Sequence, residues 1–376
     1  MNIDRLLLES IRKCFFKGKA IIVVGPRQVG KTTLMKILQK EFHEQETVFL
    51  NCDEPDTAAL LKKVTSTELK NLIGHKKIVF IDEAQRIENI GITLKLIIDN
   101  VNDIQLVVSS SSSLDIRNRI NEPLTGRKFE YNLYPFSTAE LINSTSLTEE
   151  KRLIEQRLLY GMYPDIVNNP SEARRLLMEL SSSYLYKDIL IYKDIRNPEA
   201  ITKLLTALAL QLGSELSYNE LANTIGVSCE TVEKYIDLLE KVFIVFKLIS
   251  FSRNLRNEMK KSRKIYFYDN GIRNAIIRNF QPLELRNDIG QLWENFCVSE
   301  RKKRNEYNEI FTNTYFWRTH AQQEIDYIEE RDGQLFVFEL KWNEKKQVKI
   351  PKSFANAYPN HTFSVINRSN YLDFVL

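Results

Sequence analysis

The chain has 376 residues, of which 43% are hydrophobic and 27% charged, enough apolar sequence for two or three ordinary domains. The formal net charge of +4 is too small to indicate nucleic-acid binding, so such a function must rest on local clusters. The cysteines at 14, 52, 229 and 297 are isolated from one another, which argues against a disulfide framework or zinc ribbon and favours a reducing cytosol.

Residues 1–140 predict an α/β domain built on a parallel sheet. The first 20 residues carry charges throughout, so we expect no signal peptide, and no apolar run approaches the roughly 20 residues of a membrane span. We therefore expect a cytoplasmic protein with no membrane partner. Continuous apolar strands that alternate with helices are typical of a parallel sheet covered on both faces. We expect a helix at 3–16 and strands at 20–24, 47–51, 77–83 and 105–110.

A phosphate-binding loop follows the first strand. GPRQVGKTT matches the pattern GxxxxGK[ST], comes after a strand and opens a helix, where backbone N–H groups and the helix N-terminus favour bound phosphate. Lys31 is expected to reach the β- and γ-phosphates of ATP, and the Thr32 hydroxyl to bind Mg²⁺. The residues predicted to contact the nucleotide here are Gly25, Pro26, Arg27, Gln28, Val29, Gly30, Lys31, Thr32 and Thr33.

Two acidic residues end the third predicted strand, in the sequence FIDE. We expect Asp82 to hold the magnesium through water, and Glu83 to orient or deprotonate the water that attacks the γ-phosphate. Adjacent acids at a strand end can also form a solvated turn, but the phosphate loop favours the catalytic interpretation. The two motifs together predict ATP hydrolysis.

Residues at and after the end of the fourth strand are further candidates for the nucleotide site. Ser109 or Ser110 lies where a side chain can sense the γ-phosphate, although the serines from 109 to 113 equally fit a flexible turn. An arginine could stabilise transition-state charge in its own subunit or a neighbour's, although a surface position is commoner for arginine. The candidate arginines are Arg117, Arg119 and Arg127, and we include Ser110 and Arg127 in the predicted site.

These segments resemble a family of bacterial and archaeal AAA-type ATPases whose C-terminal region is a domain of unknown function. The likeness is carried by GPRQVGKTT, FIDEAQRI, the serine-rich strand end and LTGRKFEYNLYPFSTAEL, and continues through YLYKDIL, KIYFYDNGIRNA and GQLWENF. The resemblance implies an ATP-binding core, a winged-helix segment and an end similar to restriction endonucleases. Ser109 and Ser110 stand where relatives often have Thr-Gly.

Residues 141–197 are predicted to be helical and to form a lid over the nucleotide. Helical sequence at 149–160 and 172–186 is interrupted by the breaker cluster Gly-Met-Tyr-Pro at 161–164. A helical segment that follows an ATPase core is the natural candidate for such a lid.

Residues 198–283 predict a winged-helix-like domain. Ser217 and Ser228 are expected to cap the second and third helices of a helix-turn-helix. The third helix presents an acidic surface that phosphates would repel, so DNA binding and simple packing remain alternatives for it. Six lysines and arginines between residues 253 and 264 form a basic hairpin segment, which is the stronger candidate for a phosphate contact although a charge run is usually a solvated face.

Residues 284–376 predict a nuclease-like α/β domain. Asp326, followed on the next strand by Glu339-x-Lys341, reproduces the acid-and-ExK arrangement of restriction-type and Holliday-junction-resolvase-like nucleases. Asp326 and Glu339 would chelate Mg²⁺ and Lys341 would position or activate water, while Glu294 could add an acid from the preceding helix. Acids and lysines beside strands are common, so a scaffold without activity is the competing interpretation.

Two functions follow from these predictions. In the first, ATP hydrolysis is coupled to DNA binding or processing by the C-terminal domains. In the second, the protein is a nucleotide switch whose C-terminal modules bind other proteins, with the nuclease-like domain inactive. A homo-oligomer is compatible with both.

Overall fold

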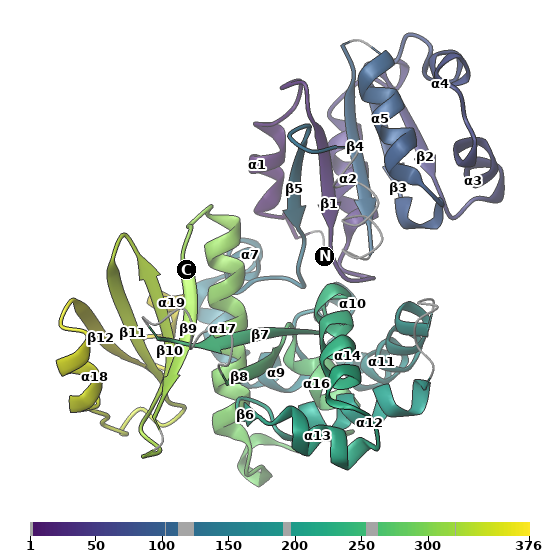
Figure 1. The fold of residues 1–376 in the computed structure, drawn as a ribbon. Coiled ribbons are helices and arrows are strands. Elements are labelled where there is room, and N and C mark those ends of the chain that lie inside the picture. Colours follow the sequence, from purple (N-terminus) through teal and green to yellow (C-terminus); the bar gives the residue numbers. More distant parts are fainter. Residues whose placement is uncertain (1–2, 102, 112–123, 191–196, 253–261, 320) are drawn as a thin grey trace. The chain divides into compact units, whose positions relative to one another are not determined.

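The computed structural model describes residues 3–101, 103–111, 124–190, 197–252, 262–319 and 321–376. The chain forms two compact units, one of Met1–Pro135 with Lys241–Phe243 and the other of Phe136–Glu240 with Ile244–Leu376. Each unit has its own sheet and its own core (Figure 1). The segments predicted as lid, winged-helix-like domain and nuclease-like domain lie almost entirely in the second unit.

The first unit is built on a five-stranded sheet in which every strand runs parallel to its neighbours. All side chains of β1, β3 and β4 are buried, so both faces of the sheet are covered. This confirms the predicted α/β class with a parallel sheet. In spatial order the strands are β2 (Thr47–Asn51), β3 (Ile78–Asp82), β4 (Gln105–Ser110), β1 (Ala20–Val24) and β5 (Lys128–Asn132).

The helices of the first unit begin and end at local signals. A capping box starts α4, because Thr65 Oγ1 accepts the Glu68 N–H at 3.3 Å and the Glu68 carboxylate accepts the Thr65 N–H at 2.8 Å. The first helix is shorter than the predicted 3–16: it runs from Leu7 to Arg12, and Phe16, with a φ of 57°, cannot belong to a right-handed helix. The helices are α1 (Leu7–Arg12), α2 (Lys31–Lys40), α3 (Pro55–Lys62), α4 (Ser66–Ile73) and α5 (Ile90–Asn100), with 3-10 turns η1 (Glu44–Glu46) and η2 (Ala84–Arg86).

The second unit contains a seven-stranded mixed sheet. Strands β7 and β9 pair in parallel, with Ile249 opposite Tyr315, and this pairing joins the predicted winged-helix-like and nuclease-like segments into one sheet. The apolar run at 242–246 predicts a strand from Val242, but β7 starts only at Val245, because Phe243 has a φ of 61°. In spatial order the strands are β12 (His361–Ile366), β11 (Gln334–Leu340), β10 (Glu324–Arg331), β9 (Asn313–Arg318), β7 (Val245–Ser250), β8 (Arg263–Phe267) and β6 (Glu215–Leu216).

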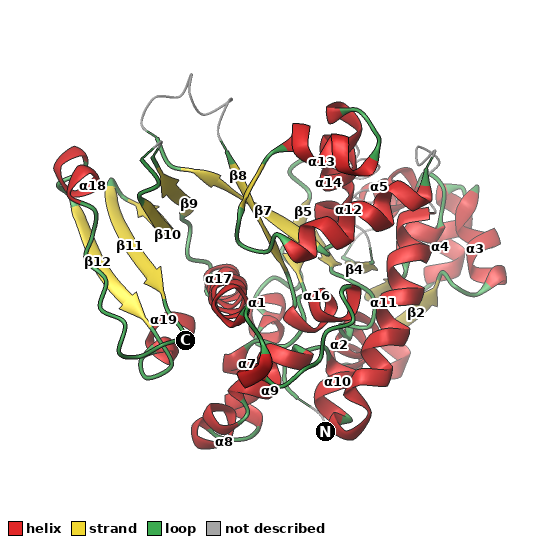
Figure 2. Cartoon of the chain, turned by 90° about the horizontal axis from the view of Figure 1, so that it is seen from below, coloured by secondary structure: helices red, strands yellow, loops and turns green. Residues whose placement is uncertain are grey.

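Helices of the second unit pack on this sheet and on one another (Figure 2). The predicted helix at 149–160 is divided at Leu153, whose ψ of 1° interrupts the helix. Helices α9 and α11, expected in a lid, pack on α16. The helices are α7 (Thr138–Ser144), α8 (Leu147–Arg152), α9 (Ile154–Tyr160), α10 (Pro164–Asn168), α11 (Ala173–Leu190), α12 (Pro198–Leu210), α13 (Tyr218–Ile225), α14 (Cys229–Lys241), α16 (Asn270–Ile276), α17 (Ile289–Tyr307), α18 (Lys352–Ala357) and α19 (Tyr371–Val375), with 3-10 turns η3 (Pro170–Glu172) and η4 (Leu283–Leu285).

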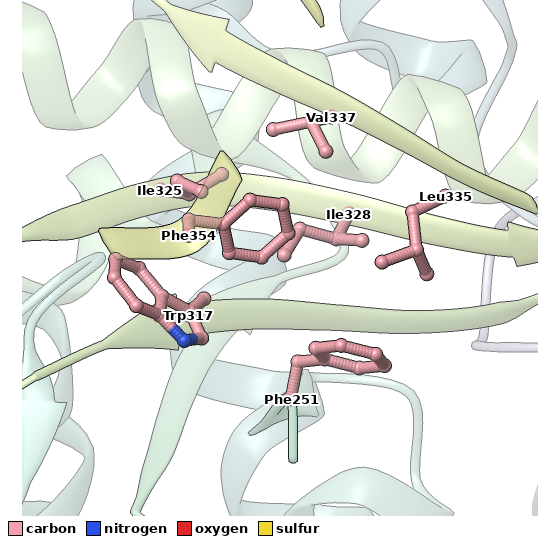
Figure 3. Packing of buried hydrophobic residues seen from close by; sticks show 7 residues of the cluster. All are labelled: Phe251, Trp317, Ile325, Ile328, Leu335, Val337 and Phe354. Atoms are coloured by element: carbon pink, nitrogen blue, oxygen red, sulfur yellow. The ribbon is translucent and has the colours of Figure 1, made fainter. Parts of the chain in front are cut away.

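An apolar cluster fills one face of the sheet near β9, β10 and β11. Figure 3 shows these side chains converging, with the Trp317 and Phe354 rings edge to face at a centroid distance of 5.2 Å. Ile325 and Ile328 of β10 both join the cluster although they lie three residues apart, because the strand's register shifts between them. Asp326, the residue after Ile325, is directed to the opposite face. The members are Phe251, Trp317, Ile325, Ile328, Leu335, Val337 and Phe354.

The motif blocks YDNGIRNA and QLWENF form a buried polar network between elements. Asn274 Nδ2 donates to the carbonyl of Leu158, at 3.1 Å, and so ties α16 to α9. Asn295 exchanges hydrogen bonds of 2.7 and 3.0 Å with the main chain of Phe267, which ties α17 to β8. Arg273 Nε donates at 2.8 Å to a carbonyl in the last turn of α12. The blocks that characterise the resemblance therefore serve, in large part, to hold the second unit together.

A buried ion pair on α17 holds the segment that enters the second unit. Lys303 Nζ donates to Glu300 Oε1 at 2.7 Å and to the carbonyl of Phe136 at 3.0 Å. Glu300 Oε2 accepts the N–H of Thr138 at 2.6 Å. Both charged side chains are only 1% exposed, so each depends on the other for compensation.

Replacing Lys303 by Met is therefore expected to destabilise the second unit by about 3–5 kcal/mol, because the Glu300 carboxylate remains buried without its cation. Urea unfolding followed by tryptophan fluorescence measures this, since Trp293, Trp317 and Trp342 all lie in the second unit. Lys302→Met is the matched control: its pair with Glu306 is partly exposed, and its loss should cost less than about 1 kcal/mol. Equal losses in the two variants would contradict the prediction.

Candidate functional site

The phosphate loop leaves β1 at Val24 and ends where α2 begins at Lys31. Gly30, the N-cap of α2, has a φ of 93°, and Gln28 also lies in the left-handed region at 60°. Gly25 must lack a side chain, because a Cβ there would lie 2.1 Å from the carbonyl oxygen of Leu133 at the end of β5. The fold of the loop thus depends on the neighbouring strand as well as on its own sequence.

The predicted lysine and threonine of the loop lie beside the predicted acids. Lys31 is 4% exposed, and its Nζ donates to the carbonyls of Gly25 and Pro26 at 3.0 and 2.9 Å. The same Nζ is 4.0 Å from Glu83 Oε1. Thr32 Oγ1 donates to Asp82 Oδ2 at 2.7 Å. The strand end of β3 and the start of α2 therefore present one lysine, one hydroxyl and two carboxylates to the same place.

Ser109, rather than Ser110, has its side chain against the predicted magnesium ligand. Ser109 Oγ donates to Asp82 Oδ1 and accepts the N–H of Glu83 at 3.1 Å. The carbonyl of Ser110 accepts the N–H of Gly25 at 3.2 Å. Both serines lie in β4 and are fully buried, so the flexible-turn alternative is wrong for these two residues. Ser112 and Ser113 lie outside the described residues.

The donor set fits a magnesium–triphosphate complex. Mg²⁺ prefers oxygen ligands and is commonly held by one or two protein oxygens together with phosphates and water. The Thr32 hydroxyl and the Asp82 carboxylate provide such oxygens 2.7 Å apart, with Lys31 next to them as the cation for phosphate. Of the other loop residues, Val29 is buried, Arg27 and Gly30 are half-buried, and Gln28 and Thr33 are exposed.

Two residues that the sequence analysis did not include support this site. Arg5, only 6% exposed, donates from Nη1 to the carbonyl of Val29 in the phosphate loop at 3.1 Å. Gln85 donates from Nε2 to Glu83 Oε2 and, at 2.8 Å, to Ser111 Oγ. Arg5 belongs to no motif. Gln85 lies in the block FIDEAQRI, two residues beyond Glu83, and that position could have drawn attention to it.

Arg127 lies at the opposite end of the sheet from the phosphate loop, which corrects its assignment to this chain's own nucleotide site. Strand β5 runs parallel to β1, with Lys128 opposite Ala20 at the start of β1. The loop leaves after Val24, roughly 16 Å further along a five-residue strand. Arg127 pairs instead with Asp99. Arg117 and Arg119 lie outside the described residues.

A second candidate site is a cavity of about 550 Å³ in the second unit. The four residues predicted for nuclease chemistry, Glu294, Asp326, Glu339 and Lys341, all line it. Lys341 Nζ is 2.6 Å from Asp326 Oδ2 and 2.7 Å from Glu339 Oε2. The ExK arrangement therefore does bring its lysine and both carboxylates together, with the ammonium between the two acids.

Lys264, which the sequence analysis counted in the basic hairpin segment, is instead buried and completes this cluster, so it cannot contact phosphate there. Lys264 of β8 is 1% exposed, and its Nζ lies 3.0 Å from Glu294 Oε1 and 2.5 Å from Glu324 Oε1. Tyr266 donates its hydroxyl to Glu294 Oε1 at 2.6 Å. Glu294 is thus held by β8, which belongs to the segment predicted as winged-helix-like.

The close packing of these charges changes their proton affinities. Burial, reinforced by the neighbouring Asp326 carboxylate, raises the pKa of Glu339 from its ordinary 4.5 to about 7. Burial likewise raises the pKa of Glu294. For Lys264 and Lys341 burial by itself would lower the pKa, but the surrounding carboxylates outweigh it and the pKa of each lysine is raised. Both ammonium groups are therefore charged at neutral pH.

In this second site, two carboxylates are placed where they could bind a metal ion. Within the described part of the chain, no group of three or more histidine, cysteine, aspartate or glutamate side chains is arranged to hold a metal. Asp326 and Glu339 could bind Mg²⁺ only together with water or phosphate oxygens, and the ammonium of Lys341 now lies between them.

Helix α14 and the basic hairpin segment are the two elements predicted to contact DNA. On α14, Glu233 lies 3.7 Å from Arg263, Glu240 lies 3.2 Å from Lys247, and Asp237 also pairs with Lys247. The acidic side of this helix is therefore partly neutralised by the β7–β8 hairpin. Most of the basic hairpin segment, residues 253–261, lies outside the described residues.

Comparison with known proteins shows that segments of both units match protein families. Residues 17–142, which lie mostly in the first unit, match an AAA domain. Residues 151–283 and 289–373 match two domains of unknown function, DUF8612 and DUF4143. The first of these two matches ends at residue 283 and the second begins at residue 289.

Relatives are found in bacteria and archaea. The uncharacterized protein Rv2008c of Mycobacterium tuberculosis is 26% identical over 340 residues, which are 88% of this chain and 72% of that protein. The uncharacterized protein MJ1544 of Methanocaldococcus jannaschii is 21% identical over 345 residues, 86% of this chain and 75% of that protein. The likeness therefore extends over both units.

Two solved structures align weakly. The structure of Drosophila ORC bound to AT-rich DNA and Cdc6 is 10% identical with a TM-score of 0.26, covering 72% of this chain and 90% of that chain. The Pif1 helicase from Candida albicans is 15% identical with a TM-score of 0.26, covering 53% and 50%. At these TM-scores neither alignment establishes a shared fold. Among the described helices, none combines the length and the apolar character needed to cross a membrane.

The raised pKa of Glu339 has a measurable consequence. Between pH 4.5 and about 7 the folded protein keeps a proton on Glu339 that the unfolded chain loses, so this group's contribution to the free energy of unfolding falls as the pH rises through that window. Infrared difference spectra should show a protonated carboxyl that disappears with a midpoint near pH 7 and is absent from Glu339→Gln. The control Glu344→Gln changes an exposed carboxylate and should leave that band in place. A wild-type midpoint near pH 4.5 would refute the prediction.

Proposed function

We propose that the protein binds ATP with Mg²⁺ at the edge of the first unit's sheet and hydrolyses it. The observation that carries this proposal is the 2.7 Å hydrogen bond from the Thr32 hydroxyl to the Asp82 carboxylate, which brings the two predicted magnesium ligands together. The AAA domain match over residues 17–142 supports it independently of that geometry.

Each residue of the site has a role that follows from its position. The backbone of residues 25–30 and the N-terminus of α2 would cradle the phosphates, and Lys31 would turn from the carbonyls of Gly25 and Pro26 towards them. Ser109 holds Asp82 in orientation for the metal. Glu83 would accept the proton of the attacking water. Bound ATP and Mg²⁺ would supply the electrophilic γ-phosphate and neutralise its charge.

Two variants should distinguish ATP binding from ATP hydrolysis. Lys31→Ala is expected to weaken ATP binding, because it removes the cation next to the phosphates. Glu83→Gln should keep binding within a few-fold and lower kcat by about a hundredfold or more, because an amide cannot take up the proton. Fluorescent-nucleotide titration and phosphate release measure the two effects, with the exposed Lys36→Ala on the same helix as control. Failure of the wild-type protein to bind ATP at all would end the proposal.

We further propose that the second unit couples this ATPase to DNA binding or processing. The order α12–β6–α13–α14–β7–β8 matches that of a winged helix, and the acid-and-ExK residues line a single cavity. These features support the proposal that residues 198–283 and 284–376 act on DNA. The competing function, a nucleotide switch with an inactive nuclease-like scaffold, is favoured by one observation: Lys341 forms ion pairs with both proposed metal ligands.

ATPase assays with and without DNA separate the two functions. Stimulation of hydrolysis by duplex or branched DNA is expected if the units are coupled, and DNA affinity should fall as the salt concentration rises. If Mg²⁺-dependent cleavage is observed, Asp326→Ala and Lys341→Ala should each reduce it by about a hundredfold or more, whereas Glu344→Ala should not. The absence of DNA binding at low salt would instead favour the scaffold.

A further inference from the structure

The carboxamide of Gln85 connects the predicted catalytic glutamate with the end of β4. Gln85 lies in the 3-10 turn η2 directly after Glu83, and Ser111 follows the last residue of β4. Ser111 N–H donates to Gln85 Oε1 at 3.2 Å, and Gln85 Nε2 donates to Ser111 Oγ at 2.8 Å. Gln85 Nε2 also donates to Glu83 Oε2. One side chain therefore contacts both segments.

These contacts determine which end of the amide faces the carboxylate. A main-chain N–H can only donate, so the atom of Gln85 that meets Ser111 N–H must be the oxygen. The amide nitrogen is then the end directed at Glu83, and a carboxylate accepts that hydrogen bond without penalty. The orientation follows from Ser111, so rotation of the amide would lose two contacts at once.

Glu83 is otherwise held by contacts that leave its side chain little freedom. Its backbone has a φ of 53°, the left-handed conformation, and its N–H donates to Ser109 Oγ at 3.1 Å. Its Oε1 lies 4.0 Å from Lys31 Nζ, and its side chain is 18% exposed. Lys31 and Gln85 therefore flank the carboxylate, one at each oxygen.

We propose that Gln85 is a positioning residue for ATP hydrolysis, which orients the Glu83 carboxylate for the attacking water and ties it to the end of β4. This inference rests on the proposed ATPase function. Within the described residues, the hydrogen bonds of the Gln85 side chain go to Glu83 and Ser111 and not to the phosphate loop. Gln85 therefore acts on the hydrolysis step and not on nucleotide affinity. Ser111 contributes indirectly, because its hydrogen bonds fix the orientation of the Gln85 amide.

Steady-state hydrolysis and nucleotide titration of the full-length chain test this role. Gln85→Ala is expected to lower kcat between about tenfold and a hundredfold, less than loss of the general base itself, while the Kd for ATP changes less than twofold. Ser111→Ala should have a smaller effect, because its main-chain N–H still holds the amide oxygen. Gln45→Ala, an exposed glutamine in η1 of the same unit, is the matched control and should behave as wild type.

The split between kcat and ATP affinity distinguishes positioning from a merely structural contribution. Loss of the Glu83 orientation lowers kcat alone, while a structural defect lowers kcat, ATP affinity and Tm together.

Three results would overturn the inference. A Gln85→Ala kcat within twofold of wild type would do so, as would an equal loss of kcat and ATP affinity accompanied by a lower Tm. A wild-type protein that binds and hydrolyses no ATP overturns the proposed function together with this inference, so the two failures are distinguishable.

Discussion

The first unit's candidate site depends on the hydrogen bonds that the buried carboxylate of Asp82 accepts. Asp82 is 3% exposed, and a buried charge of this kind is stable only when hydrogen bonds compensate it. Thr32 at the start of α2 supplies one bond, and Ser109 on β4 supplies the other. The ends of β3 and β4 and the helix that follows β1 are therefore held together at one edge of the sheet. The same arrangement places Glu83, the next residue, opposite Lys31.

The second unit also buries carboxylates that need compensation, and it contains more charged side chains. Its cavity brings carboxylates from α17, β10 and β11 together, and two lysines, Lys264 and Lys341, lie among them. Without those cations the acids would repel one another and take up protons. Lys264 comes from β8, so the β7–β8 hairpin contributes to the acidic site as well as to the sheet. The sequence predicts two separate domains at 198–283 and 284–376, but hydrogen bonds and ion pairs join these two segments.

Local patterns in the sequence were sufficient to predict much of this architecture. The strands at 20–24, 47–51 and 105–110 agree with β1, β2 and β4, because runs rich in β-branched, aliphatic and aromatic residues indicate a strand without reference to the rest of the fold. The edge strand β5 was missed, since its half-buried sequence KFEYN lacks such a run. Boundaries failed where one residue adopts a left-handed conformation, as at Phe16 and Phe243.

By itself, the sequence determined the phosphate loop and the acids beyond β3, because each is a short contiguous motif whose chemistry depends on spacing along the chain. The tertiary structure alone decided which other side chains join them. Arg5, Gln85 and Lys264 reach their partners across 24, 26 and 30 residues of sequence, and spacing along the chain does not encode such contacts. Strand direction decided against Arg127, because a parallel β5 begins at the far end of β1 from the phosphate loop. Contacts of this kind exist only once the sheet has set its register.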